Sequence, residues 1–212
     1  MSHKGIHSRG YLPHWDFAKS LQGITFRLHD SVPAKVVAAW RGELKVELEN
    51  PDPTKSNHAK NESHRRITRY EDAGHGCCLL RNPDHARIIQ SLLIGNHGKD
   101  HELIEWCIMP NHVHVLVKLL GEVSLGNIVK RWKAVSAVGI NRGDGMKGQV
   151  WMRDYHDRLI RDEEHFHNAR IYIRNNPVMA GLCGESEEWE WSGAGQAWGV
   201  KPVVGTQVEL AK

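Results

Sequence analysis

Two histidines, His112 and His114, stand one residue apart in the apolar run "WCIMPNHVHVLVKLL" at residues 106–120. Alternate side chains of a β-strand point to the same face, so both imidazoles would project together. Two neutral imidazoles this close can form half of a divalent metal site. The alternative is a pair of polar residues on the solvated face of a sheet.

A second pair of candidate residues lies in "ARIYIRNNP", where Tyr172 and Asn176 are four positions apart. On a helix, residues at this spacing share one face. The carbonyl oxygen of Asn176 suits a hard divalent cation. The Tyr172 phenol can attack phosphorus once it loses its proton, and a metal on the phosphate would assist that attack. The alternative is a tyrosine that only packs and an asparagine that only caps the helix.

Tyr155, in "WMRDYHDRL", is the competing nucleophile because histidine and aspartate flank it. Residue 159, four positions later, is a leucine and cannot ligate a metal. Tyr172 is preferred because its partner at the next turn could complete the metal site.

Hydrophobic spacing predicts the elements that must position these side chains. Strands are expected at 23–30, on both sides of Pro110–Asn111 as an antiparallel pair, and at 149–160. Helices are expected at 31–49 with Ser31 as N-cap, at 82–98 with Asn82 as N-cap, and at 124–143 with Ser124 as N-cap. A last helix begins at Asp162 and is expected to end at Pro177.

This order predicts an α+β fold of the ferredoxin-like, split βαβ type, with helices on one face of the sheet. One domain over residues 1–212 is expected, with an N-terminal arm at 1–20, an inserted helical and loop segment at 31–80 and a tail at 195–212. Within the insertion, the polar, proline-containing stretch 50–66 is predicted to be a mobile loop.

The totals exclude several classes of protein. Of 212 residues, 40% are hydrophobic and 25% are charged, with a net charge of +3, which permits an anionic partner. The four cysteines include no CxxC pair, which disfavours a zinc ribbon or redox motif and favours a reducing cytoplasm. No run of about 18 apolar residues predicts a membrane span, and no signal peptide is expected.

The blocks "CIMPNHVHVLVKLL", "GQVWMRDYHDRLIRDEEHFHNARIYIRNNPVMAGL" and "WEWSGAG" closely resemble the REP-associated tyrosine transposases. These bacterial proteins are single-tyrosine HUH nucleases, named for a His-hydrophobe-His motif. The N-terminal stretch "RGYLPHWDF…GITFRLHDSVP" resembles the start of the same family. The resemblance covers most of the chain and leaves out the polar loop and about the last 15 residues.

The resemblance implies that His112 and His114 form the HUH motif, Tyr172 is the nucleophile and Asn176 is the third metal ligand. A divalent ion, Mg²⁺ or Mn²⁺, would polarise the scissile phosphate of single-stranded DNA. The tyrosine would form a 5′-phosphotyrosine and free a 3′-hydroxyl, without ATP. The ferredoxin-like fold is also implied.

The resemblance further implies a hairpin DNA partner. A cytoplasmic location in a bacterium is expected, and the protein is expected to be a monomer or a homodimer. Cationic side chains neutralise phosphates, and aromatic side chains stack on unpaired bases. The candidate DNA contacts are Lys4, Arg9, Tyr11, His14, Trp15, Lys130, Arg131 and Lys133, with Arg142 and Lys147 as further cations.

Three other functions remain open at this point. The chain could bind DNA hairpins without cutting them, although the intact His112, His114, Tyr172 and Asn176 argue against this. It could be another HUH nuclease, such as a plasmid relaxase or a replication initiator, whose chains are often larger. A zinc hydrolase is disfavoured because no further His, Cys or carboxylate stands at a recognisable spacing.

Overall fold

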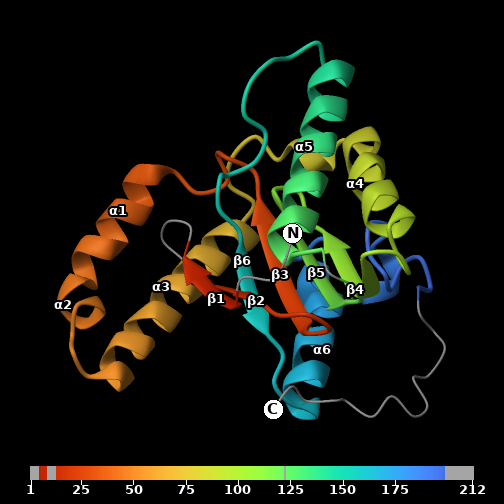
Figure 1. The fold of residues 1–212 in the computed structure, drawn as a ribbon. Helices are drawn as coiled ribbons and strands as arrows, with labels where there is room; N and C mark the ends of the chain where they lie inside the picture. The colour runs from red at the N-terminus through yellow and green to blue at the C-terminus, as the bar shows by residue number, and fades with distance from the viewer. Residues whose placement is uncertain (1–4, 9–12, 122, 199–212) are drawn as a thin grey trace.

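The computed structural model describes residues 5–8, 13–121 and 123–198. It confirms the predicted α+β class: the described residues form a four-stranded antiparallel sheet, a two-stranded hairpin and six α-helices (Figure 1). The sheet order is β4-β5-β3-β6. The ferredoxin-like form of this class stays a prediction.

The central strands are β3 (Leu21–Arg27) and β5 (His112–Leu119), flanked by β4 (His101–Ile108) and β6 (His156–Leu159). The predicted antiparallel pair around Pro110–Asn111 is confirmed as β4 and β5. In the register of β3 against β5, Thr25 lies opposite His114 and Arg27 lies opposite His112. The register therefore places polar side chains of β3 beside both histidines.

The sheet buries both of its faces. On one face, valines 113, 115 and 117 of β5 pack in a core with α4 (Pro83–Gly95) and α5 (Leu125–Gly143). On the other face, Leu116 packs in a second core with α6 (Glu163–Met179). The expectation of helices on one face is therefore wrong, and the histidine face is covered by α6.

The predicted mobile loop at 50–66 is wrong, because α3 (Pro53–Asp72) occupies this stretch. Asp52 caps the helix by accepting a hydrogen bond from the Thr54 amide at 2.9 Å, and Pro53 occupies the first helical position. Aspartate followed by proline here starts a helix instead of breaking one, since the first turn has no internal acceptor for its amides.

The predicted helix at 31–49 is divided into α1 (Ala34–Glu43) and α2 (Lys45–Leu48). Ser31 does not cap α1, because its hydroxyl donates to the Leu28 carbonyl at 2.9 Å. The segment expected as an insertion thus contributes three helices, which stand to one side of the sheet (Figure 1). Short η1 (Leu79–Arg81) leads from there to α4.

The caps of α4 and α6 agree with the sequence. Asn82 accepts from the Asp84 amide at 3.0 Å, and Asp162 accepts from the His165 amide at 2.7 Å. Ser124 is the N-cap residue of α5, without a side-chain hydrogen bond. Pro177 does not end α6, which continues to Met179, because a proline in the last turn removes only one amide donor.

Of the predicted strand at 149–160, only residues 156–159 form a regular strand, β6. Before β6, Trp151 pairs with Leu28 through an isolated bridge. The Tyr155 amide donates to the Asp154 side chain at 3.0 Å, which takes this amide out of a strand ladder. After α6, η2 (Ser186–Glu188) leads to residues 189–198, where Ser192 bridges to Cys107 at the β4 edge. No helix in the described ranges has the length and apolar character needed to cross a bilayer.

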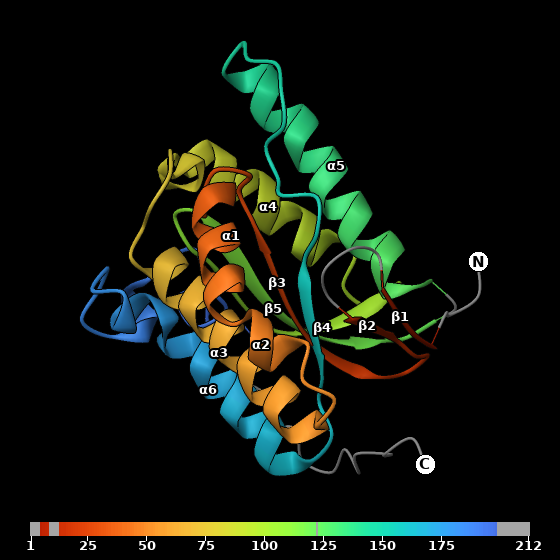
Figure 2. The ribbon, with the colours of Figure 1, turned by 90° about the vertical axis from the view of Figure 1, so that its left-hand side faces the viewer.

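The N-terminal segment is packed where it is described, and its assignment as an arm at 1–20 stays a prediction. β1 (Gly5–Ser8) and β2 (Pro13–Asp16) pair as an antiparallel hairpin. His14 of β2 is 1% exposed and pairs with Asp157 of β6 and, at 3.0 Å, with Asp154. Figure 2 shows the hairpin beside the sheet.

The His14 contact predicts a pH-dependent stability. Burial lowers the pKa of His14, but hydrogen bonds to Asp154 and Asp157 and their charges raise it to about 9. Because this exceeds the unfolded value of 6.5, the stabilisation is complete below that pH and is lost as the pH rises through 9. Urea unfolding between these pH values should show a smaller pH dependence for His14→Gln than for the wild type. If the free energy of unfolding changed equally with pH in the two proteins, the pairing of a charged His14 with Asp154 and Asp157 would be contradicted.

Candidate active site

The two histidines of β5 converge on one point. Their Nε2 atoms are 2.8 Å apart, and the two rings are nearly perpendicular, at 85°. His112 is fully buried and His114 is 3% exposed. The solvated-face alternative is therefore wrong, and the pair presents two nitrogen ligands to the same position.

Neighbouring side chains fix the ring orientations. The Nδ1 of His112 donates to the Asn111 Oδ1 at 2.7 Å, and the Nδ1 of His114 lies 2.9 Å from the Thr25 hydroxyl. Burial, together with the charge of Arg27, lowers the pKa of His112 to about 3. His112 is thus neutral near pH 7, with its Nε2 lone pair available to a metal.

Tyr172 and Asn176 lie on α6, which packs over the histidine face. The Tyr172 ring is 5.4 Å from the His114 ring, measured between centroids. Burial raises the pKa of the Tyr172 phenol above its usual range, and the charges of Asp72 and Glu71 raise it further. Asn176 is buried, and its side-chain contact with the phenol acts in the opposite direction by lowering the pKa of Tyr172. Its Oδ1 has no other hydrogen-bond partner among the described residues.

Asp72, the last residue of α3, is a candidate ligand that the sequence reasoning missed. Its Oδ1 lies 3.6 Å from the His112 Nε2, and the ligand atoms of Asp72, His112 and His114 all lie within 4.8 Å of one another. Burial raises the pKa of Asp72 to about 6, and its Oδ1 has no hydrogen-bond partner among the described residues. Because residues 50–66 were predicted to be a loop, no helix was expected to end at Asp72.

Two contacts hold the end of α3 at the histidines. Arg27 of β3 donates to Glu71 at 2.7 Å. Asn111 donates through its Nδ2 to the carbonyls of Glu71, at 3.0 Å, and His75, at 2.9 Å. Asn111 therefore orients His112 with one side-chain atom and holds the α3 terminus with the other.

The donor set fits a divalent cation. Two imidazole nitrogens converge beside a partly buried carboxylate oxygen, and an amide oxygen without a partner lies on the covering helix. Mixed nitrogen and oxygen ligands of this kind suit Mn²⁺ and related ions. The unpartnered polar atoms of Asp72 and Asn176 support the fit, because buried polar atoms are rarely left without a partner.

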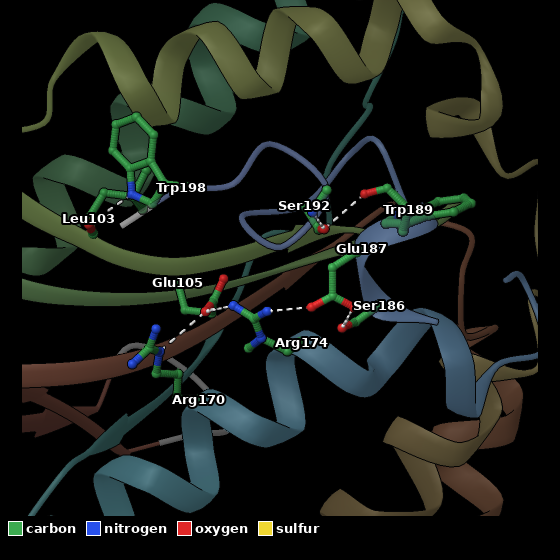
Figure 3. A network of polar contacts seen from close by, with 10 residues as sticks. Leu103, Glu105, Arg170, Arg174, Ser186, Glu187, Trp189, Ser192 and Trp198 are labelled. Carbon is green, nitrogen blue, oxygen red and sulfur yellow. Dashed lines mark hydrogen bonds and ion pairs between the residues drawn. The ribbon is translucent and has the colours of Figure 1, made fainter. Parts of the chain in front are cut away.

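A buried carboxylate of β4 fixes α6 against the sheet, as Figure 3 shows. Glu105 is fully buried, and both Arg170 and Arg174 of α6 lie 3.4 Å from its Oε2. Arg174 also donates to Glu187 at 2.7 Å. These arginines stand one turn apart and lie on either side of Tyr172 in the sequence, so their contact with Glu105 sets the position of the tyrosine over the histidines.

Tyr155 is not brought to the histidines. It is 7% exposed and belongs to the core on the α4 and α5 side, and its ring is 4.4 Å from that of His14. The alternative nucleophile therefore packs in the core opposite the histidine face.

The candidate DNA contacts have different environments. His14 is buried in an ion pair, so its predicted stacking on bases is wrong. Lys130 is exposed, Arg131 pairs with Asp100, and Lys133 donates to the Arg153 carbonyl. Lys4, Arg9 and Tyr11, with the side chain of Trp15, lie outside the described part of the chain.

Residues 79–176 match the sequence model of the family described as "Transposase IS200 like". This segment, which contains His112, His114, Tyr172 and Asn176, is similar to the transposases of that family. The predicted resemblance to the REP-associated tyrosine transposases is confirmed by the relatives found.

Two relatives come from Haemophilus influenzae. One, named "Putative REP-associated tyrosine transposase", is 26% identical over 101 residues, which cover 43% of this chain and 57% of the relative. An uncharacterized protein is 29% identical over 97 residues, covering 35% of this chain and 53% of that protein. The chain thus matches a little over half the length of these curated relatives.

The fold is also similar to the solved structure of a REP-associated tyrosine transposase bound to a REP hairpin. The TM-score is 0.57 at 15% identity, over 94% of this chain and 92% of the other. At this level of identity the similarity supports the fold.

Glu105 is buried, whereas its partners Arg170 and Arg174 are partly exposed. Removing the carboxylate and removing the arginines should therefore change the free energy of unfolding by different amounts. Burial raises the pKa of Glu105 despite the opposing charges of Arg174 and Arg170. Folding therefore does not stabilise the ionised carboxylate relative to the protonated one. Glu105→Gln should change the free energy of unfolding only slightly. Arg170→Met with Arg174→Met should cost about 3 kcal/mol, because a buried carboxylate would lose its counterions. Urea denaturation of both variants checks the order, and a larger loss for Glu105→Gln would contradict it.

The position of Asp72 predicts a role in metal affinity. Asp72→Asn should weaken Mn²⁺ binding about tenfold or more in calorimetric titration, because a charged oxygen ligand is replaced by a neutral one. Asp84→Asn is the matched control, since that carboxylate is exposed at the start of α4 and pairs with Arg87. Equal Mn²⁺ affinity in the wild type and Asp72→Asn would remove Asp72 from the site.

Proposed function

We propose that this protein is a metal-dependent endonuclease and strand transferase that acts on single-stranded DNA bearing a hairpin. The convergence of the His112 and His114 Nε2 atoms beside the ring of Tyr172 carries the proposal. Nucleophile and metal ligands come from one chain, so the chemistry requires no residue of a second copy. The REP hairpin bound by the similar transposase supports hairpin DNA as the partner.

The proposed reaction is a transesterification at phosphorus. The Tyr172 oxygen attacks the scissile phosphate and loses its proton as the new P–O bond forms. The P–O3′ bond breaks, and the released 3′ oxygen takes up a proton. The product is a 5′-phosphotyrosine, and attack by another 3′-hydroxyl reverses the step and joins new strands.

Activation of the phenol is the main requirement, because burial and nearby carboxylates raise its pKa. Mg²⁺ or Mn²⁺ held by His112, His114, Asn176 and Asp72 would make the phosphate more electrophilic and neutralise charge that develops on its oxygens. Asn111 and Thr25 keep the imidazoles oriented, and the Glu105 contacts hold α6 in place.

A non-cutting hairpin binder is the main rival from a different class. Such a protein would have no use for two converging imidazoles next to an oriented tyrosine, and buried polar atoms without partners destabilise a fold. A relaxase or replication initiator would use the same kind of site. The match to the IS200-like transposase family over residues 79–176 favours the transposase.

The nucleophile can be tested by covalent capture. Wild-type protein with labelled hairpin-bearing single-stranded DNA and Mn²⁺ should give a protein–DNA adduct on a denaturing gel. Tyr172→Phe should give none, because only the attacking oxygen is removed, and it should still bind the DNA.

Tyr155→Phe is the matched control, because this tyrosine is buried in the opposite core. It should form the adduct as the wild type does, and EDTA should prevent the adduct in both. An adduct formed by Tyr172→Phe but not by Tyr155→Phe would overturn the assignment. Binding without any adduct, across a set of hairpins, would favour the non-cutting rival.

A further inference from the structure

A large groove lies between the three helices of the inserted segment and the strand edge that leads to the candidate active site. Its volume is about 1380 Å³. One wall comes from α1, α2 and α3, and the opposite side from residues 152–162 and the start of α6. Figure 2 shows α2, α3 and α6 along this side of the molecule.

The groove is continuous with the site around Tyr172. A smaller cavity of about 300 Å³ is lined by His114 and Tyr172 themselves. The two hollows share five lining residues: Thr25, His156, Arg158, His165 and Asn168. A chain lying in the groove would therefore reach the position where the tyrosine and the histidines meet.

The floor of this path is on the histidine face of the sheet. Thr25 pairs in register with both His114 and His156, and Gly23 pairs with Arg158. Because residues opposite each other in an antiparallel pair point to the same face, Arg158 projects from the same side as His114. Arg158 is exposed and lines both the groove and the cavity that contains Tyr172.

Exposed cations from three different elements line the groove. Lys45 of α2, Lys60 of α3 and Arg158 of β6 are exposed, and none forms an ion pair with another described residue. They come from three elements that are distant in the sequence. Three cations on different walls of an open groove suit a flexible polyanion better than a compact ligand.

Most of the acidic side chains that line the groove already have partners. Glu71 pairs with Arg27, and both Asp154 and Asp157 pair with His14. Asp162 caps α6. Two exposed carboxylates, Glu49 and Glu164, have neither kind of partner among the described residues.

We infer that this groove binds the single-stranded DNA segment next to the cleaved phosphate, and that the inserted helices form one wall of the DNA path. The inference rests on the proposed function for the position of the scissile phosphate. Lys45, Lys60 and Arg158 contact the sugar–phosphate backbone, and the contacts carry no sequence preference.

The test uses full-length protein carrying Tyr172→Phe, so that no cleavage occurs, and a fluorescent oligothymidine of about 20 nucleotides. Affinity is measured by anisotropy between about 50 and 200 mM salt. The variant Lys45→Ala/Lys60→Ala/Arg158→Ala should bind roughly tenfold more weakly at the lower salt. Its slope of log affinity against log salt should be smaller by about 2, because each lost phosphate contact in single strands removes about 0.7.

The matched control is Lys35→Ala/Arg81→Ala/Lys99→Ala, which removes three exposed cations that do not line the groove. It should keep the salt slope of the parent protein. Thermal unfolding of both triple variants detects a folding defect. Such a defect would reduce the amount of folded protein, but the folded molecules would keep the parent's slope of log affinity against log salt.

An unchanged slope in the groove variant, or no binding of the oligothymidine by the parent protein, would overturn the inference. The adduct assay remains a separate measurement. Adduct formation with an unchanged groove slope would leave the nuclease proposal standing and remove the groove. If the groove variant had a reduced salt slope but the wild type formed no adduct, DNA binding in the groove would stand and the nuclease proposal would fall.

Discussion

The active-site arrangement depends on one buried amide, that of Asn111. Its Oδ1 accepts from His112, and its Nδ2 donates to the carbonyls of Glu71 and His75. A buried amide is costly unless its hydrogen bonds are made, so this residue forces the turn before β5 and the end of α3 to meet. Asp72 reaches the histidines because the helix that carries it ends at this junction.

Buried charges perform the same function elsewhere in the fold. Arg27 with Glu71, Arg170 and Arg174 with Glu105, and His14 with Asp157 each join an outlying element to the sheet. Apolar packing alone would allow α6 to slide on the flat face of the sheet, whereas a charge buried on β4 has few favourable positions for its counterions. The tyrosine is thereby held at a fixed place over the histidines.

The local elements could be predicted because their signals lie within a few residues of one another. Alternation or helical spacing correctly located β3, β4, β5, α4, α5 and α6, and the side-chain caps at Asn82 and Asp162 were readable as such. Spacing also selected His112, His114, Tyr172 and Asn176, because strand and helix periods decide which side chains share a face. The family resemblance gave these residues their expected roles.

The sequence by itself therefore determined the α+β class and the candidate chemical groups of this protein, and the tertiary structure decided how they are completed. Contacts between distant segments decide four features of the site. They place α6 over the histidine face and Asp72 beside the histidines, and they bury His14 and Tyr155. Such contacts leave no local period. The polar helix α3 illustrates the reason: its composition resembles a loop, and its position is set by Asn111 and Arg27, about 40 residues away on either side.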